Sequence, residues 1–189
     1  MELSKAVSLA HLSEVTMTTS DPARLCRFVL DHLHLRLGYR RCAFLLVRPG
    51  ASRLQVYHRC PGTLTLDEQL REVKRVNGLW QQARGGVIDH VMRAGRGMVV
   101  NDVGTFPGYV RSDSAMRAEA CFPLMADGAC LGVLDAESET AYKFDWEDHV
   151  VLTALAGQMG QVLARRWNVV EPVLAEAATG AVSLLPRLA

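Results

Sequence analysis

Apolar residues recur every three or four positions in three parts of the chain, which is the spacing of an amphipathic α-helix. These parts cover residues 21–37, 87–94 and 146–170. Pro22 stands at the first helical position of the first part, where its fixed backbone angle suits a helix start. The third helix is expected to end before Pro172, because proline interrupts a helix interior.

Short apolar or alternating runs between turn residues predict strands. Five strands are expected, at residues 41–47, 54–59, 98–101, 119–125 and 129–137. The first two and the last two form hairpins, and Asp127 with Gly128 supplies the turn of the second hairpin. Residues 63–86 are expected to be a crossover with a short helix, a turn at Asn77–Gly78 and a loop that carries Trp80.

This order of elements predicts an α+β fold. We expect a central antiparallel sheet with helices packed on one face and loops closing a ligand pocket on the other. The domain is predicted to span residues 21–170, after an N-terminal segment of residues 1–20. Residues 171–189 form a tail whose structure the pattern does not assign.

The charge balance excludes some partners. The chain has 21 Lys and Arg against 20 Asp and Glu, a net charge of +1, so neither nucleic acid nor an anionic membrane is an expected partner. No apolar run is long enough for a membrane span, and a cytoplasmic location is expected. The five cysteines are scattered, which argues against a disulfide framework and a zinc site.

Three segments give the chain a resemblance to GAF domains, the small-molecule sensory modules of signalling proteins. They are the Pro-Leu hairpin of residues 122–134, the Val-Asn-Asp strand end of residues 100–102, and residues 144–148. The resemblance implies a GAF/PAS-like sheet, in which residues 102–137 form one wall of the ligand pocket.

Within that superfamily, the chain looks similar to free methionine-(R)-sulfoxide reductases. The resemblance places Ile88 and Ser112 where those enzymes have cysteines, and neither side chain replaces a thiolate. We therefore expect no catalytic residues, and a sensory domain that is not an enzyme. The alternative is a divergent thiol-dependent reductase that uses Cys121 or Cys130, whose positions on either side of one turn allow them to meet.

The same resemblance places Glu119, Asp135 and Glu137 where the reductases hold their amino-acid substrate. Three converging carboxylates repel one another unless a proton or a cation separates them. A ligand ammonium is the expected cation, and no metal site is expected. The predicted ligand-binding residues are Glu119, Asp135, Glu137, Asp113, Trp80 and Cys121.

Structural roles compete with several of these assignments. Glu137 could be a solvated strand end, Asp135 could cap the following turn, and Trp80 could anchor its loop instead of covering a ligand cation. Arg111 or Arg117 could receive a ligand carboxylate.

Other GAF ligands remain alternatives, and the cofactor stays undetermined. Haem would need an axial histidine, for which His90 and His149 are the candidates. Residues 142–144 and 147–148 loosely resemble a cyclic-nucleotide signature. Non-haem iron is disfavoured, because Arg117 and Glu119 stand where iron-binding GAF domains have a His-x-Cys pair. Bilin is disfavoured because the loop after residue 102 has no cysteine.

The expected partners are a small-molecule ligand, a second copy of the chain and a signalling output protein. The apolar stripe of residues 146–170 is wider than one sheet face requires, so a homodimer through the terminal helices is predicted. A structural GAF domain that only pairs, without ligand, is a further alternative.

Overall fold

The computed structural model describes residues 3–47, 54–59, 65–82, 86–111 and 113–179. A five-stranded sheet with the order β2-β1-β5-β4-β3 forms its centre, and every neighbouring pair is antiparallel. The strands are β1 (Arg41–Val47), β2 (Leu54–Arg59), β3 (Met98–Val100), β4 (Ala118–Ala126) and β5 (Ala129–Ser138). Both predicted hairpins are confirmed.

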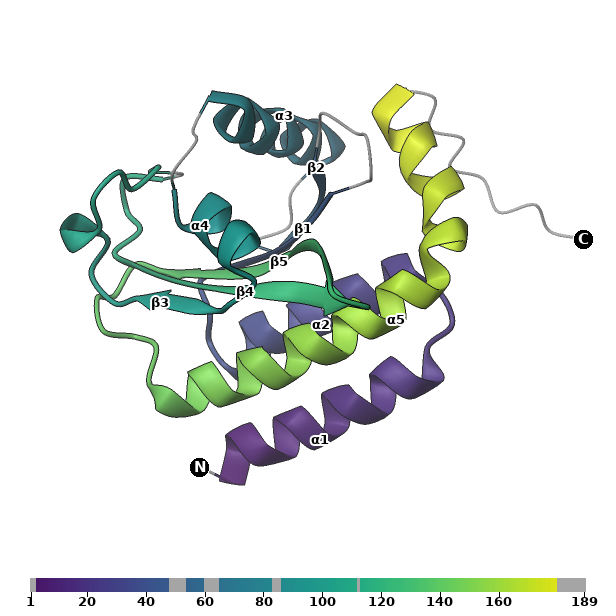
Figure 1. The fold of residues 1–189 in the computed structure, drawn as a ribbon, viewed down its shortest axis with the longest axis horizontal. Coiled ribbons are helices and arrows are strands. Elements are labelled where there is room, and N and C mark those ends of the chain that lie inside the picture. Colours follow the sequence, from purple (N-terminus) through teal and green to yellow (C-terminus); the bar gives the residue numbers. More distant parts are fainter. Residues whose placement is uncertain (1–2, 48–53, 60–64, 83–85, 112, 180–189) are drawn as a thin grey trace, which may run out of the picture.

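Helices cover both faces of this sheet (Figure 1). One layer consists of α1 (Leu3–Thr18), α2 (Pro22–Arg36) and α5 (Trp146–Thr179). The opposite face carries α3 (Leu66–Gln82) and α4 (Val87–Ala94). The predicted α+β class and antiparallel sheet are confirmed, and the face expected to be closed by loops also carries the two helices α3 and α4.

The helix α2 begins and ends where its sequence predicts. The Asp21 carboxylate accepts hydrogen bonds from the backbone N–H groups of Ala23 and Arg24, at 2.8 and 3.2 Å. Such a cap satisfies amide groups that have no partner inside the helix. Leu25, Val29 and other apolar residues of its inner face are fully buried.

The crossover differs from the prediction, because α3 continues through Asn77 and Gly78. The Asn77 side-chain amide donates to the carbonyl of Val73 at 3.0 Å and is buried, so its polar group is satisfied within the helix. The predicted turn is therefore wrong, and Trp80 lies on a helix rather than a loop.

The two ends of the domain also differ from the prediction. The N-terminal segment forms α1, which lies beside α5, where Ser13 and the Gln158 amide share a hydrogen bond. Lys5 forms an ion pair of 2.8 Å with Asp145. The long helix α5 passes Pro172 and ends at Thr179, so the predicted break is wrong.

Two apolar cores lie on opposite faces of the sheet. Phe44, Phe122 and Leu134 point to the larger core, beneath α1, α2 and α5. Val133 and Cys121 belong to the smaller core, on the side of α3 and α4. Because side chains alternate along a strand, Glu119, two positions before Cys121, faces this second side, as do Asp135 and Glu137, which come two and four positions after Val133.

Cys121 and Cys130 do not meet across the hairpin. Cys121 pairs with Asp135, whereas Cys130 pairs with Met125, four positions further along β4. That offset separates the two Cα atoms by roughly 13 Å, whereas a disulfide needs about 7 Å or less. Both are free thiols.

Among the described residues, no helix is long and apolar enough to cross a membrane.

Candidate functional site

The register of β4 and β5 brings four polar side chains together. Glu119 pairs with Glu137, and Cys121 pairs with Asp135 two positions further on. All four residues are on the face covered by α3 and α4, and they are between 0 and 8% exposed. Three of the predicted carboxylates and the predicted thiol thus form one buried cluster, which we call the acidic cluster.

The inner part of the acidic cluster is tightly spaced. One ligand atom from each of Glu119, Cys121 and Asp135 lies within 4.8 Å of the others. The Asp135 Oδ1 atom is buried and has no hydrogen-bond partner in the described part of the chain. The buried Tyr109 hydroxyl is near Glu119 but forms no hydrogen bond of normal geometry. Buried polar atoms of native proteins usually have a partner, so these two indicate a missing one.

Burial and like charge change the acidity of the cluster. Burial, then the charge of Glu137, raises the pKa of Glu119 to about 8. Burial raises the pKa of Asp135 well above its usual range, and the carboxylates of Glu119 and Glu137 raise it further. At neutral pH these carboxyl groups therefore retain protons that a bound cation would replace.

The same causes act on the thiol of Cys121. Burial raises its pKa well above the ordinary value, and the charges of Asp135 and Glu119 add to this. The side chain is accordingly a neutral thiol at neutral pH, and a neutral thiol is a poor nucleophile.

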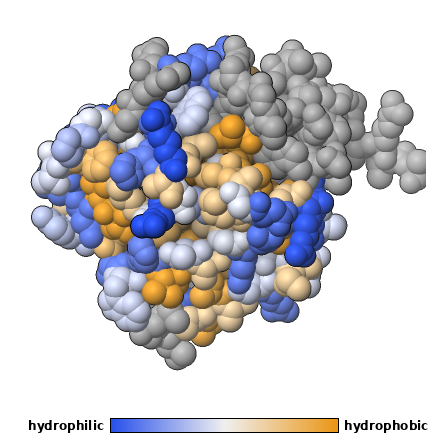
Figure 2. Space-filling model, in the orientation of Figure 1, coloured by the Kyte–Doolittle hydropathy of each residue, from blue (hydrophilic) through white to orange (hydrophobic). Residues whose placement is uncertain are grey.

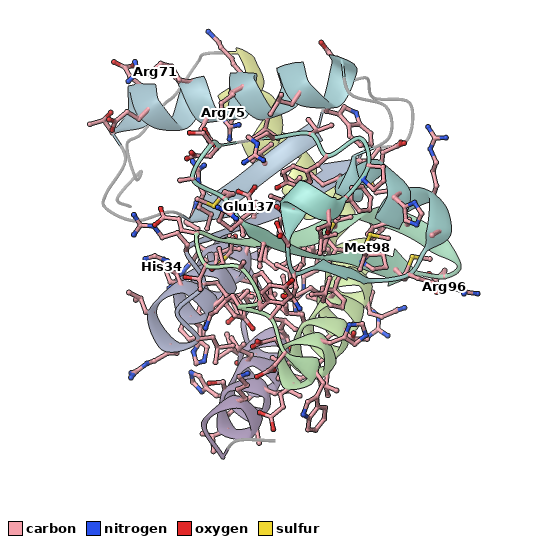
Figure 3. All side chains as sticks on the ribbon, turned by 90° about the vertical axis from the view of Figure 1, so that its left-hand side faces the viewer. His34, Arg71, Arg75, Arg96, Met98 and Glu137 are labelled. Carbon is pink, nitrogen blue, oxygen red and sulfur yellow. The ribbon has the colours of Figure 1, made fainter. Side chains whose placement is uncertain are left out.

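Guanidinium groups border the acidic cluster. Arg41 contacts Asp113 at 3.1 Å and Glu72 at 3.5 Å, and Arg75 donates to Glu72 at 2.8 Å. In Figure 3, Arg75 descends from α3 toward the sheet, above Glu137. The site therefore combines a buried acidic centre with an edge of arginine–carboxylate ion pairs.

The remaining wall is apolar. Trp80 of α3, Ile88 of α4 and Tyr109 are partly buried and pack against the smaller core. This placement agrees with the anchoring alternative for Trp80, and it puts its indole on the same face as the acidic cluster.

The other predicted residues have separate places. Asp113 is at the edge of the site, held by Arg41. Arg111 reaches the carbonyls of Ser114 and Met116 at 3.4 Å, and Arg117 is exposed. Ser112 lies outside the described residues.

The histidine and cyclic-nucleotide candidates do not join the cluster. His149 packs edge-on against Phe122, on the larger-core side of the sheet, and His90 is exposed. Asp148 of the nucleotide-like signature accepts the Tyr39 hydroxyl at 2.7 Å and pairs with Lys5 at 3.0 Å. Asp148 therefore has a structural role: it joins α5 to α1 and to the segment before β1.

Sequence reasoning missed the two arginines of the edge. Arg41 begins β1 and Arg75 lies on α3, so only the folded sheet and crossover bring them to the acids. The one available signal is amphipathic: Glu72 and Arg75 are one helical turn apart and can face the same side.

The family comparison agrees with this geometry. Residues 19–164 match the model of the GAF domain family. The chain belongs to the GAF family. The GAF fold is a sensory and regulatory fold, and the proteins similar to this chain include a structure named as a GAF sensor protein as well as enzymes.

Three similar proteins illustrate this range. The free methionine-R-sulfoxide reductase of Escherichia coli is 35% identical over 65 residues, which are 34% of this chain and 39% of the relative. The substrate-bound structure of the Neisseria meningitidis reductase has a TM-score of 0.70 at 24% identity, and the match covers 87% of this chain and 91% of that one. The GAF domain of an Acinetobacter phosphoenolpyruvate-protein phosphotransferase has a TM-score of 0.69 at 13% identity, covering 89% of this chain and 98% of that one.

These comparisons correct one expectation. We expected a domain that is not an enzyme, yet enzymes occur among both the sequence relatives and the structural neighbours. The similarity is limited: the matched segments span 39–44% of the curated relatives, and the structural likeness shows the fold alone. Similarity to these proteins therefore gives no reason to exclude catalysis by this chain.

Proposed function

We propose that this GAF domain binds a small zwitterionic, amino-acid-like metabolite in signal transduction, with the ligand ammonium at the acidic cluster. The observation that carries the proposal is the buried Asp135 Oδ1, which lies beside Glu119 and has no hydrogen-bond partner of normal geometry among the described residues. Burial and mutual repulsion hold protons on these carboxyl groups, and a bound cation would replace those protons. An ammonium group offers three donors and one positive charge, which complements these acceptors.

The two arginines at the edge of the site support the zwitterionic form. Arg75 and Arg41 stand next to the acids, and a guanidinium can bind a carboxylate through two parallel hydrogen bonds. The apolar wall of Trp80, Ile88 and Tyr109 offers a surface for the ligand side chain. The relatives named as reductases of free methionine sulfoxide support the same ligand class.

A thermal-shift panel tests the proposal. The panel contains the free amino acids, methionine sulfoxide and cyclic nucleotides, because cyclic nucleotides are the competing ligand class. At least one amino-acid-like member should raise the melting temperature of the wild type, and Glu119→Gln or Asp135→Asn should abolish that rise.

Asp127→Asn is the matched control, because it removes a carboxylate from the exposed turn of the same hairpin. It should leave the rise unchanged. A panel without any amino-acid-like hit, or a rise that survives both site variants, would refute the acidic-cluster proposal.

A second candidate function is sulfoxide reduction by Cys121, whose Sγ atom is at the acidic cluster. In that reaction the thiol sulfur takes the oxygen of a sulfoxide, which leaves a sulfenic acid on Cys121 and releases the thioether. An external dithiol then restores the thiol, with loss of water and formation of its own disulfide. The raised pKa of Cys121 makes slow turnover the expected behaviour.

Turnover of free methionine (R)-sulfoxide with dithiothreitol tests this second function. Loss of product in Cys121→Ser but not in Cys130→Ser would support it. Absence of methionine formation by the wild type would reject the reductase function. The binding proposal would be unaffected, because the thermal-shift panel tests it separately.

We also propose that the helical layer pairs two copies of the chain. The apolar stripe of α5, on which the dimer prediction rested, is largely buried within one chain, so exposed residues of α1 and α2 carry the proposal. Val7 and Met17 of α1 are 58% and 80% exposed, and Leu35 of α2 is 68% exposed. Figure 2 shows hydrophobic residues scattered among hydrophilic ones on the face in view. Light scattering after size exclusion should give a dimer that Met17→Lys weakens; a monomer at high concentration would exclude this pairing.

A further inference from the structure

Cys121 adds a sulfur atom to the acidic cluster, and the binding of an ammonium group does not require this atom. Its sulfur lies with oxygens of Glu119 and Asp135 in a group whose atoms are all within 4.8 Å. One thiolate and two carboxylates are a ligand set for Zn²⁺ and similar first-row ions, whereas Mg²⁺ and Ca²⁺ prefer oxygen alone. The three residues come from two paired strands, so they do not form a recognisable metal-binding motif in the sequence.

The spacing is close to what a metal requires. Zinc binds sulfur at about 2.3 Å and carboxylate oxygen at about 2.0–2.2 Å, so tetrahedral ligand atoms stand roughly 3.3–3.8 Å apart. Cys121 and Asp135 are directly opposite on β4 and β5, and Glu119 is two positions from Cys121 on the same face of β4, so side-chain rotation can bring the three ligand atoms closer together.

An independent observation points to a missing occupant. Asp135 is only 8% exposed, and its Oδ1 atom has no hydrogen-bond partner among the described residues. The buried Tyr109 hydroxyl lies near Glu119 on the same side and also lacks a hydrogen bond of normal geometry among the described residues. A metal ion would bind the first atom, and a metal-bound water could accept a hydrogen bond from the second.

We propose that Glu119, Cys121 and Asp135 bind a divalent first-row transition metal of the zinc type, with its fourth position open to water or a ligand. On binding, the Cys121 thiol gives its proton to solvent and becomes a thiolate ligand. A structural zinc site fills all four positions with protein, whereas three protein ligands leave one exchangeable position. The metal would compete with the ammonium for the same carboxylates, so this proposal goes beyond the proposed function.

Cobalt titration tests the proposal directly. The protein is stripped with a chelator, dialysed and titrated with CoCl₂ without amino acid under anaerobic conditions. The wild type should develop a thiolate-to-cobalt charge-transfer band and the intense visible bands of tetrahedral cobalt. One equivalent of ZnCl₂ should displace the cobalt, so that the charge-transfer band and the visible cobalt bands both disappear.

Two variants test two of the proposed ligands, and a third serves as a control. Cys121→Ser should lose the charge-transfer band, and Asp135→Asn should weaken cobalt binding about tenfold or more. Cys130→Ser is the matched control, because this partly exposed thiol of the same hairpin lies far along the strand from the cluster. It should keep the wild-type spectrum. A wild type without the band, or a band that survives Cys121→Ser, would overturn the proposal.

X-ray absorption of the zinc-loaded wild type removes any dependence on variant folding. The expected shell has one sulfur at about 2.3 Å and oxygen ligands at about 2.0 Å. A shell of oxygen and nitrogen alone would overturn the proposal even if zinc binds.

Discussion

Glu119 and Glu137 stand directly opposite each other on β4 and β5, and both are more than 90% buried. Like charges at paired positions of a sheet destabilise it, and burial increases their cost. Arg75 of α3, which lies above Glu137, offsets part of this repulsion. The fold thus tolerates an unfavourable arrangement that a bound cation would make favourable.

The first prediction concerns pH. The pKa of Glu119 is about 8 in the folded chain, above its ordinary value of 4.5, because of burial first and Glu137 second. The folded state therefore holds a proton more tightly than the unfolded state. This stabilisation is complete below about pH 4.5 and is lost as the pH rises through about 8.

Calorimetry of the metal-free, ligand-free protein should show a melting temperature that falls between pH 5.5 and pH 8.5. Glu119→Gln carries no titrating proton at this position, so its decline should be shallower. An equal slope in the variant would show that another group causes the decline.

The second prediction concerns the edge of the site. Arg75→Met removes a guanidinium beside Glu72 and Glu137, so a ligand carboxylate would lose a charged hydrogen bond worth about 1.5–3 kcal/mol. Calorimetric titration should show that Arg75→Met binds a free amino acid roughly tenfold or more weakly than the wild type does. The affinity for the corresponding amino-acid amide, which lacks the carboxylate, should change little. Arg71→Met, on an exposed position one turn earlier in α3, is the control and should bind both normally.

The third prediction concerns the strand that positions Asp135. Gly132 has φ of +148°, and a Cβ atom there would stand 2.1 Å from the carbonyl oxygen of Leu45 on β1. Gly132→Ala should therefore destabilise the protein by about 2 kcal/mol or more in urea unfolding. Gly157→Ala on α5 meets no atom within 4 Å and should stabilise it by up to about 1 kcal/mol. Equal effects of the two substitutions would contradict this packing.

The strands and hairpins could be predicted because their signals are local. Both strands of the first hairpin have the bounds that their apolar pattern gives, and the Asp127–Gly128 turn closes the second hairpin. Helix α1 could not be predicted, because its apolar periodicity is weak and its contacts with α5 stabilise it. The Asn77–Gly78 dipeptide, a turn signal in isolation, is overridden inside a strongly amphipathic helix.

The sequence also predicts one part of the candidate site and not the other. Its acids follow from the resemblance together with strand alternation, which places Glu119, Asp135 and Glu137 on one face. The cross-strand position of Cys121 beside Asp135 depends on register, and the position of Arg75 depends on how the crossover packs. Neither relationship is encoded in local sequence.

Calorimetric titration of an amino acid and its N-acetyl derivative tests the central claim most directly, using the amino acid with the largest thermal shift. Acetylation removes the positive charge that the acidic cluster is proposed to bind. The wild type should bind the free amino acid at least about tenfold more tightly, a difference of roughly 1.4 kcal/mol. The difference should shrink in Asp135→Asn. Equal affinity of the wild type for the two compounds would contradict the account.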